Sequence, residues 1–191
     1  CCVLQVNEGV EHAGDDHAEY AERLAKIMME KIEKYYAEKG VTRPNVVIEP
    51  GRSIAAEAGL TLYTIGSIKD IPGIRKYVSV DGGMTDNIRP ALYQAEYTGV
   101  ITNKADQEKT DKVTICGKCC ESGDILITDI NIATPEAGDT FAIFSTGAYG
   151  YTMASNYNKN TIPGVVFVKD GQDRVVVKPQ TYDDMLANEI L

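Results

Sequence analysis

The pattern of apolar residues changes near Arg75, and this change most limits the folds open to the chain. Ahead of it, apolar side chains recur at helical spacing from Asp16 and stop at Gly40, which predicts a long helix, and residues 46–48 then predict a buried strand. Beyond it, short apolar runs alternate with Gly, Asp, Asn and Pro. A helix followed by a buried strand is typical of a βα barrel, whereas the later pattern favours a β-sandwich or barrel-like module.

The predicted fold class is therefore α/β plus all-β. A complete (β/α)8 barrel takes about 250 residues, and the chain has 191. We expect residues 1–75 to be the C-terminal fragment of such a barrel and residues 76–191 to form a β-rich domain. The short elements that we expect are strands over 60–68, 77–80, 113–116, 125–128, 140–144, 165–169 and 174–178, a solvated loop over 102–112, and a terminal helix started by Thr181.

The balance of charge argues against a nucleic-acid partner. Acidic residues number 28 against 19 basic ones, a net charge of -9, and the basic residues form no run that could follow a phosphate backbone. The first residues have no basic run and the chain has no long apolar stretch, so we expect neither a signal peptide nor a membrane span. Five cysteines, an odd number, form a poor disulfide framework. We therefore expect a cytoplasmic protein that binds small molecules or other proteins.

The segment Glu49-Pro50-Gly51-Arg52 follows the predicted buried strand at 46–48. It places a carboxylate, a rigid turn and a guanidinium at the C-terminal end of a strand, where barrel enzymes hold their catalytic groups. An ordinary surface ion pair at a strand exit is the alternative, because motifs of this length also match by chance.

Two later segments could also carry chemistry. Residues 81–93 contain Gly82 and Gly83 but lack the Gly-Lys-Ser/Thr ending of a phosphate loop, and Arg89 in this segment could be a solvated loop residue. The cluster of Cys116, Cys119 and Cys120 allows three interpretations. These are a thiolate zinc site completed by a cysteine at the start of the chain, buried inert thiols, and a catalytic cysteine. No second CxxC or His pair completes the zinc site, so we expect no metal.

Taken together, these segments resemble the C-terminal part of the diaminopimelate decarboxylase family, which are pyridoxal-phosphate enzymes with an alanine racemase-like fold. The resemblance extends from about Asn7 to Leu191 and rests on residues 81–93 and on three motifs: Glu49-Pro50-Gly51-Arg52, Cys120-Glu121-Ser122-Gly123-Asp124 and Gly147-Ala148-Tyr149.

The resemblance implies a role for each residue near the cofactor. Glu49 would face the pyridine nitrogen, where a carboxylate raises the pKa of that nitrogen and keeps the ring an electron sink. Gly51 and Arg52 would lie at the cofactor phosphate, and Arg52 could instead pair with the substrate carboxylate. Tyr149 would lie near cofactor and substrate, although a plain core tyrosine is the alternative.

The resemblance also implies how the substrate is held. Arg89 and Tyr93 would be substrate ligands, with Arg89 on a carboxylate. Glu121 would bind the distal ammonium of the substrate, and Cys120 would protonate the substrate carbon after carbon dioxide leaves. Because diaminopimelate carries two ammonium and two carboxylate groups, a site that recognises its far end needs a cation for the carboxylate and an anion for the ammonium. The related ornithine-type enzymes resemble this family but have a shorter Asp after the cysteine, so Glu121 favours diaminopimelate.

The implied function is decarboxylation of meso-2,6-diaminopimelate to L-lysine and carbon dioxide by a homodimer with its site at the subunit interface. The resemblance covers only the later part of the family sequence, and the Schiff-base lysine belongs to the earlier part. We therefore expect the isolated chain to be inactive. The alternatives are a non-catalytic partner or regulator of a complete homologue, a related decarboxylase of basic amino acids, and a small zinc-stabilised β module.

Overall fold

The computed structural model describes residues 2–6, 15–42, 45–47, 49 and 51–190. Its contacts divide the chain into two compact units. One unit, here called the helix unit, is Glu8–Pro50, and the other, here called the β unit, joins Cys1–Asn7 to Gly51–Leu191. Each unit is described by itself below.

The helix unit contains α1 (Asp15–Lys39), which confirms the long helix expected from Asp16. Gly40 follows it with a φ of 63°, the left-handed conformation in which glycine commonly ends a helix. Residues 45–47 form no strand, and Val47 is 81% exposed, so the prediction of a buried strand there is wrong for the residues that are described. Ile48 lies outside the described residues. Strands exist by pairing, and the described residues of this unit include no second strand to pair with.

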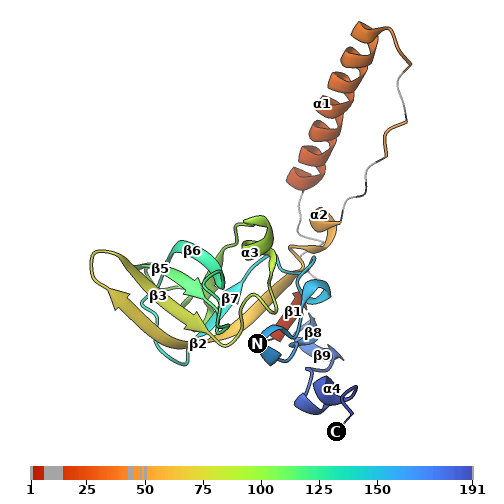
Figure 1. The fold of residues 1–191 in the computed structure, drawn as a ribbon. Helices are drawn as coiled ribbons and strands as arrows, with labels where there is room; N and C mark the ends of the chain where they lie inside the picture. The colour runs from red at the N-terminus through yellow and green to blue at the C-terminus, as the bar shows by residue number, and fades with distance from the viewer. Residues whose placement is uncertain (1, 7–14, 43–44, 48, 50, 191) are drawn as a thin grey trace. The chain divides into compact units, whose positions relative to one another are not determined.

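The β unit contains every strand that the structure describes (Figure 1). Its strands are β1 (Cys2–Val6), β2 (Gly59–Ile71), β3 (Arg75–Val80), β4 (Gly99–Ile101), β5 (Asp111–Cys116), β6 (Ile125–Ile132), β7 (Thr140–Ile143), β8 (Gly164–Lys169) and β9 (Gln172–Val177). Its helices are α2 (Arg52–Ala55), α3 (Arg89–Tyr93) and α4 (Tyr182–Leu186), with short 3₁₀ turns η2 (Thr102–Lys104), η3 (Tyr151–Met153) and η4 (Tyr157–Lys159).

The long strand β2 organises the sheet. Its first half pairs with β1 and β7, and its second half, from Ile65 onward, pairs with β3 across an irregularity between Ile65 and Ile68. The strand order is β6-β5-β3-β2-β1-β8-β9, with β7 also paired to β2 and β4 paired to β7, and the sheet is mixed. Because one strand takes part in both halves of this sheet, the halves curve around a common interior, which confirms the barrel-like β-rich domain.

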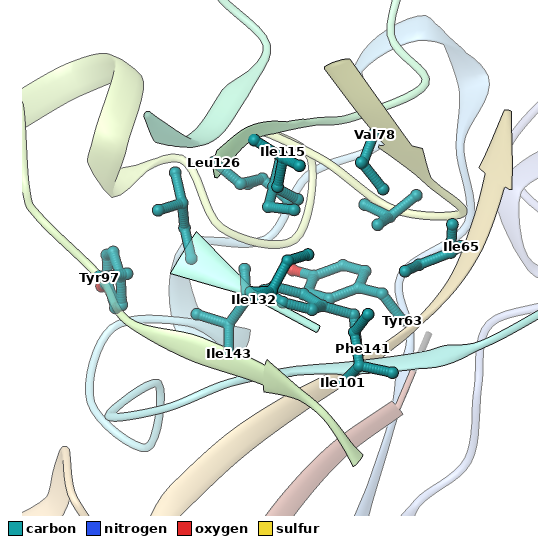
Figure 2. Packing of buried hydrophobic residues seen from close by; sticks show 13 residues of the cluster. Tyr63, Ile65, Val78, Tyr97, Ile101, Ile115, Leu126, Ile132, Phe141 and Ile143 are labelled. Atoms are coloured by element: carbon teal, nitrogen blue, oxygen red, sulfur yellow. The ribbon is translucent and has the colours of Figure 1, made fainter. Parts of the chain in front are cut away.

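The interior is filled by aliphatic side chains and by the aromatic rings of Tyr63, Tyr97 and Phe141. Tyr63 of β2 and Phe141 of β7 are at most 1% exposed and lie at the centre of the cluster shown in Figure 2. Ile65, Ile115 and Ile143 pack with them from three different strands. Burying side chains of this size contributes about 1.5–3 kcal/mol each, so this cluster is the main stabilising feature of the β unit.

The expected strands from residue 60 onward are all present within a few residues. The strand β1 was not expected; it pairs antiparallel with β2 and parallel with β8. The boundary expected near Arg75 falls in the turn of the β2–β3 hairpin, whose strands pair as far as Ile71 and Arg75, and both strands lie inside the β unit. The contacts divide the chain after Pro50 instead. The expected start of the terminal helix at Thr181 is confirmed, since Thr181 and Asp184 form a capping box.

Candidate functional site

The short helix α2 begins directly after Gly51, which is its N-cap. A Cβ at position 51 would collide with the Tyr149 hydroxyl, so only glycine allows the two segments to approach this closely. Arg52, the first residue of α2, is exposed. The predicted cofactor-binding residues Gly51 and Tyr149, 98 residues apart in the numbering, are therefore in contact across the fold.

The loop that carries Tyr149 is fixed against the end of α2 by backbone hydrogen bonds. Thr146 N donates to Gly59 O at 2.9 Å, and Gly147 N donates to Ala56 O at 3.0 Å. A Cβ on Gly147 would collide with the backbone of Ala55, which explains the glycine of the Gly-Ala-Tyr motif. Tyr149 itself has a φ of 62° and is 44% exposed, so it is a surface residue and not a plain core tyrosine.

Arg89, at the start of α3, lies against two aromatic rings. Its guanidinium carbon is 5.0 Å from the centre of the Tyr93 ring and 5.3 Å from that of Tyr149. A guanidinium at such distances is attracted by the negative face of each ring. Its Nε is buried without a hydrogen-bond partner among the described residues. The arrangement holds a half-buried cation against two rings, which contradicts the alternative of a solvated loop residue.

The loop before α3 is held from beneath by a buried carboxylate. Asp86, 5% exposed, accepts hydrogen bonds from the Tyr63 hydroxyl and from Gly83 N. A Cβ at Gly82 would collide with the Tyr63 ring, so the loop needs glycine there to lie flat on the core. Burial raises the pKa of Asp86, and the bonds from Tyr63 and Gly83 offset part of that rise. This loop, which sets where Arg89 begins, is therefore anchored in the core.

The turn that carries Cys120 and Glu121 is fixed from two sides. Asp124, 4% exposed, accepts hydrogen bonds from Met84 N at 2.6 Å and from Cys119 N at 2.8 Å. On the other side, Asn158 of η4 accepts a hydrogen bond from Cys120 N at 2.9 Å. A Cβ at Gly83 or at Gly117 would collide with the Asp124 carboxylate, so the carboxylate fits only because both residues are glycine.

The two candidate side chains on this turn point to solvent. Cys120 and Glu121 are both exposed, and the Tyr157 hydroxyl lies 3.4 Å from Glu121 Oε2. The Glu121 charge, with some help from burial, raises the pKa of Tyr157, so the phenol keeps its proton and donates to the carboxylate. In contrast, burial and the nearby Asp124 raise the pKa of the Cys119 thiol. Cys120 is thus the accessible thiol of the adjacent pair.

The predicted site residues fall into two groups in the β unit. Gly51, Arg89, Tyr93 and Tyr149 are brought together, with Arg52 next to Gly51. Cys120 and Glu121 form the second group, and the shared loop of residues 82–89 joins the two through Asp124. Glu49 belongs to the helix unit, where it is exposed and outside helix or strand.

Three residues that support the site were not singled out from the sequence. Asp124 lies within the Cys-Glu-Ser-Gly-Asp motif, so the motif itself contained that signal. Tyr157 and Asn158 carry no local signal, because their role depends on η4 lying next to a turn 36 to 38 residues earlier.

Other structural features do not coincide with the predicted site. A cavity of about 630 Å³ is lined by residues of two segments and by none of the predicted site residues. The lining residues are Pro90, Ala91, Gln94, Ala95, Glu96 and Tyr97 from the first segment and Gly123, Ile125, Leu126, Ile127 and Thr128 from the second. Among the described residues, no group of three or more His, Cys, Asp or Glu side chains could hold a metal ion. Within the same residues, no helix is long and apolar enough to cross a membrane.

Residues 5–147 match the family model described as "Pyridoxal-dependent decarboxylase, C-terminal sheet domain". The chain therefore belongs to the pyridoxal-dependent decarboxylases and contains their C-terminal sheet domain. This confirms the resemblance and the predicted cofactor of the family.

Comparison with individual relatives points to one branch of this family. The chain is 50% identical over 186 residues to the diaminopimelate decarboxylase of Bacillus subtilis (strain 168), an alignment that covers 95% of this chain and 42% of that relative. The crystal structure of diaminopimelate decarboxylase from M. jannaschii matches with a TM-score of 0.71 and 36% identity, over 88% of this chain and 38% of that one. A second M. jannaschii structure, in co-complex with L-lysine, matches with a TM-score of 0.69 and 37% identity, over 83% and 36% of the two chains. The chain thus spans well under half the length of these relatives.

Proposed function

We propose that the polypeptide containing this chain decarboxylates meso-2,6-diaminopimelate to L-lysine and carbon dioxide with pyridoxal phosphate. The observation that carries this proposal is Arg89, a half-buried cation with an unpartnered Nε, held between Tyr93 and Tyr149. A guanidinium held in place by two rings is oriented to pair with a carboxylate through its terminal nitrogens, and a substrate carboxylate would supply that partner. The name of the B. subtilis relative supports the choice of substrate.

The residues present fit the cofactor on two structural grounds. Gly51 lets the Tyr149 hydroxyl lie against the main chain at the start of α2, which places a phenolic hydrogen-bond donor there. Arg52 follows at once and is exposed, which suits a group that pairs with phosphate oxygens. Gly51, Arg52 and Tyr149 would hold the phosphate end, and Glu49 would face the ring nitrogen. Pyridoxal phosphate, when bound, supplies the electron sink that accepts the electron pair left when carbon dioxide departs.

The other site residues would bind the substrate and move a proton. Arg89 and Tyr93 would hold a substrate carboxylate, and Glu121 would hold the distal ammonium. The bond between the α-carbon and its carboxylate breaks, and a proton from Cys120 Sγ forms the new C–H bond. Solvent then returns a proton to the thiolate, for which the exposure of Cys120 is required.

We further propose that the site forms between two subunits of a cytoplasmic homodimer. The Cys120 and Glu121 side chains are exposed on the β unit, as expected of groups that complete a partner's site. Cys116, Cys119 and Cys120 are free thiols, which suits a reducing compartment. The lysine that binds the cofactor would come from the rest of the polypeptide.

The test is to supply the complete reading frame's product with pyridoxal phosphate and meso-diaminopimelate, and to measure carbon dioxide and lysine. Formation of both in equal amounts supports the proposal, and the Cys120→Ala variant should lose at least about a hundredfold in kcat. Cofactor binding without carbon dioxide release would contradict it and favour a non-catalytic partner. Faster release from ornithine than from diaminopimelate would indicate the related decarboxylases instead.

A further inference from the structure

The 3₁₀ turn η4 contacts the Cys120 turn through two consecutive residues. Asn158 Oδ1 accepts the hydrogen bond from Cys120 N at 2.9 Å, and the Tyr157 hydroxyl lies 3.4 Å from Glu121 Oε2. Tyr157 and Asn158 therefore meet different residues of the Cys120–Glu121 pair. Because two consecutive residues of η4 contact two consecutive residues of the Cys120 turn, both the position and the orientation of that turn are fixed.

The backbone of η4 adopts the conformation that this contact needs. Asn158 has a φ of 54° and a ψ of 24°, and Lys159 has a φ of 57°. The left-handed region is unfavourable for most L-residues, and asparagine tolerates it better than others. Asparagine thus meets two demands at this position: it accepts the left-handed backbone and offers a side-chain oxygen to Cys120 N.

The segment around η4 is itself fastened to the rest of the site. Ser155 N donates to Thr85 O at 2.8 Å, in the loop that precedes Arg89. Asn160 Nδ2 lies 3.7 Å from the Cys119 sulfur. Residues on both sides of η4 therefore hold it against the elements that carry the proposed catalytic groups.

We propose that Asn158 and Tyr157 are positioning residues, Asn158 for Cys120 and Tyr157 for Glu121. This inference rests on the proposed function, in which Cys120 delivers the proton and Glu121 binds the distal ammonium. Asn158 acts by keeping the Cys120 backbone in place, so its loss affects proton delivery more than substrate binding. Tyr157 acts on the carboxylate that recognises the substrate, so its loss affects binding more than proton delivery.

The variants separate these roles from a general effect on folding. Asn158→Gly keeps the left-handed backbone and removes the acceptor, whereas Asn158→Asp keeps an acceptor oxygen. Tyr157→Phe removes only the hydroxyl. Lys159→Gln is the matched control, because Lys159 shares η4 and its left-handed backbone but pairs with Glu189 at 3.1 Å.

The first measurement is the rate of alkylation of Cys120 by iodoacetamide against pH, with the modified cysteine assigned by tandem mass spectrometry. Asn158→Gly should change the limiting rate at high pH by about threefold or more, because the turn is released. Asn158→Asp should return this rate to that of the parent but move the pH midpoint upward, since an added carboxylate disfavours the thiolate. Lys159→Gln should match the parent in both.

The second measurement is steady-state decarboxylation by the complete protein. Asn158→Gly should lower kcat about tenfold with KM changed by less than about twofold, and Asn158→Asp should recover most of kcat. Tyr157→Phe should raise KM for diaminopimelate about threefold with a smaller change in kcat.

The outcomes distinguish this inference from the proposed function. A parent protein that releases no carbon dioxide would refute the proposed function, and the alkylation series would still decide whether Asn158 positions Cys120. An Asn158→Gly variant with the parent's alkylation profile would overturn the positioning role. Equal losses of kcat in Asn158→Gly and Asn158→Asp, at equal thermal stability, would overturn it as well.

Discussion

The Asp124 carboxylate accepts a hydrogen bond from Met84 N at 2.6 Å, which ties the Cys120 turn to the loop before Arg89. A second bond, from Cys119 N at 2.8 Å, leaves both carboxylate oxygens engaged with backbone donors. Because Asp124 is 4% exposed, these bonds replace water around a buried charge. The Asp124 side chain therefore fixes the position of Cys120, which would donate the proton, relative to Arg89, which would bind the carboxylate.

Replacing Asp124 by Asn should destabilise the β unit by about 2 kcal/mol, because one oxygen becomes a donor that faces a backbone N–H. Urea unfolding of the chain measures this loss. Asp129→Asn is the control, since Asp129 is exposed and its ion pairs with Arg75 and Lys112 lie on the surface. Such pairs contribute roughly 0–1 kcal/mol. A similar loss of unfolding free energy in both variants would show that the buried hydrogen bonds of Asp124 stabilise the β unit no more than the surface ion pairs of Asp129 do.

Replacing Gly51 by Ala should weaken binding of pyridoxal phosphate about tenfold, because the new methyl group displaces the Tyr149 hydroxyl and disturbs the ring against Arg89. Titration of the complete protein with the cofactor, followed by absorbance, measures the affinity. Gly66→Ala on β2 is the comparison, since its Cβ would meet only Ser79 Oγ and the Ser79 carbonyl, the nearer at 3.4 Å. Unchanged affinity in Gly51→Ala would place the phosphate elsewhere.

Replacing Arg89 by Lys keeps the charge but removes the planar group that lies against Tyr93 and Tyr149. The two ring contacts together are worth about 1–2 kcal/mol, so KM for diaminopimelate should rise about tenfold. Steady-state kinetics of the complete protein provides the test, with Arg75→Lys at the exposed pair with Asp129 as the control. A KM within twofold of the parent would argue that Arg89 does not contact substrate.

Acid should weaken the β unit partly through Asp139. Burial raises the pKa of this carboxyl, but hydrogen bonds from Lys104 and Asn103 outweigh burial and hold the pKa below its ordinary value of 3.8. A lowered pKa in the folded state gives stability that is present above the ordinary pKa and is lost as pH falls through the folded-state pKa. The parent should therefore lose stability more steeply below about pH 4 than Asp139→Asn, which thermal unfolding at each pH measures. Parallel curves would rule out this contribution.

The interface proposal predicts activity from two inactive subunits. Cys120→Ala and Glu49→Ala proteins, each inactive alone, should regain activity when mixed and allowed to exchange subunits, since one of the two sites would then carry both wild-type residues. At complete exchange, about a quarter of the sites would be intact. Absence of any recovery, with exchange verified by mass spectrometry, would place Cys120 and Glu49 in a site formed by one subunit.

Local patterns predicted the elements whose formation depends on nearby residues. The helix that ends at Gly40, the strand that becomes β2 and the cap at Thr181 follow from periodicity, from alternation and from side chains that hydrogen-bond to their own backbone. The short motifs also indicated Gly51, Arg89, Cys120, Glu121 and Tyr149 as the candidate site. These are properties of segments a few residues long, and they persist in any fold that contains those segments.

The tertiary structure decided which of these segments meet. Residues 46–48 had the composition of a buried strand, yet the described residues there are exposed, because a strand requires a neighbour that composition does not supply. The pairing of β1 with both β2 and β8, the collision that makes Gly51 necessary, and the contact of Asn158 with Cys120 all join residues distant in the chain. Contacts of this kind depend on the whole sheet closing around Tyr63 and Phe141, so no local pattern could have revealed them.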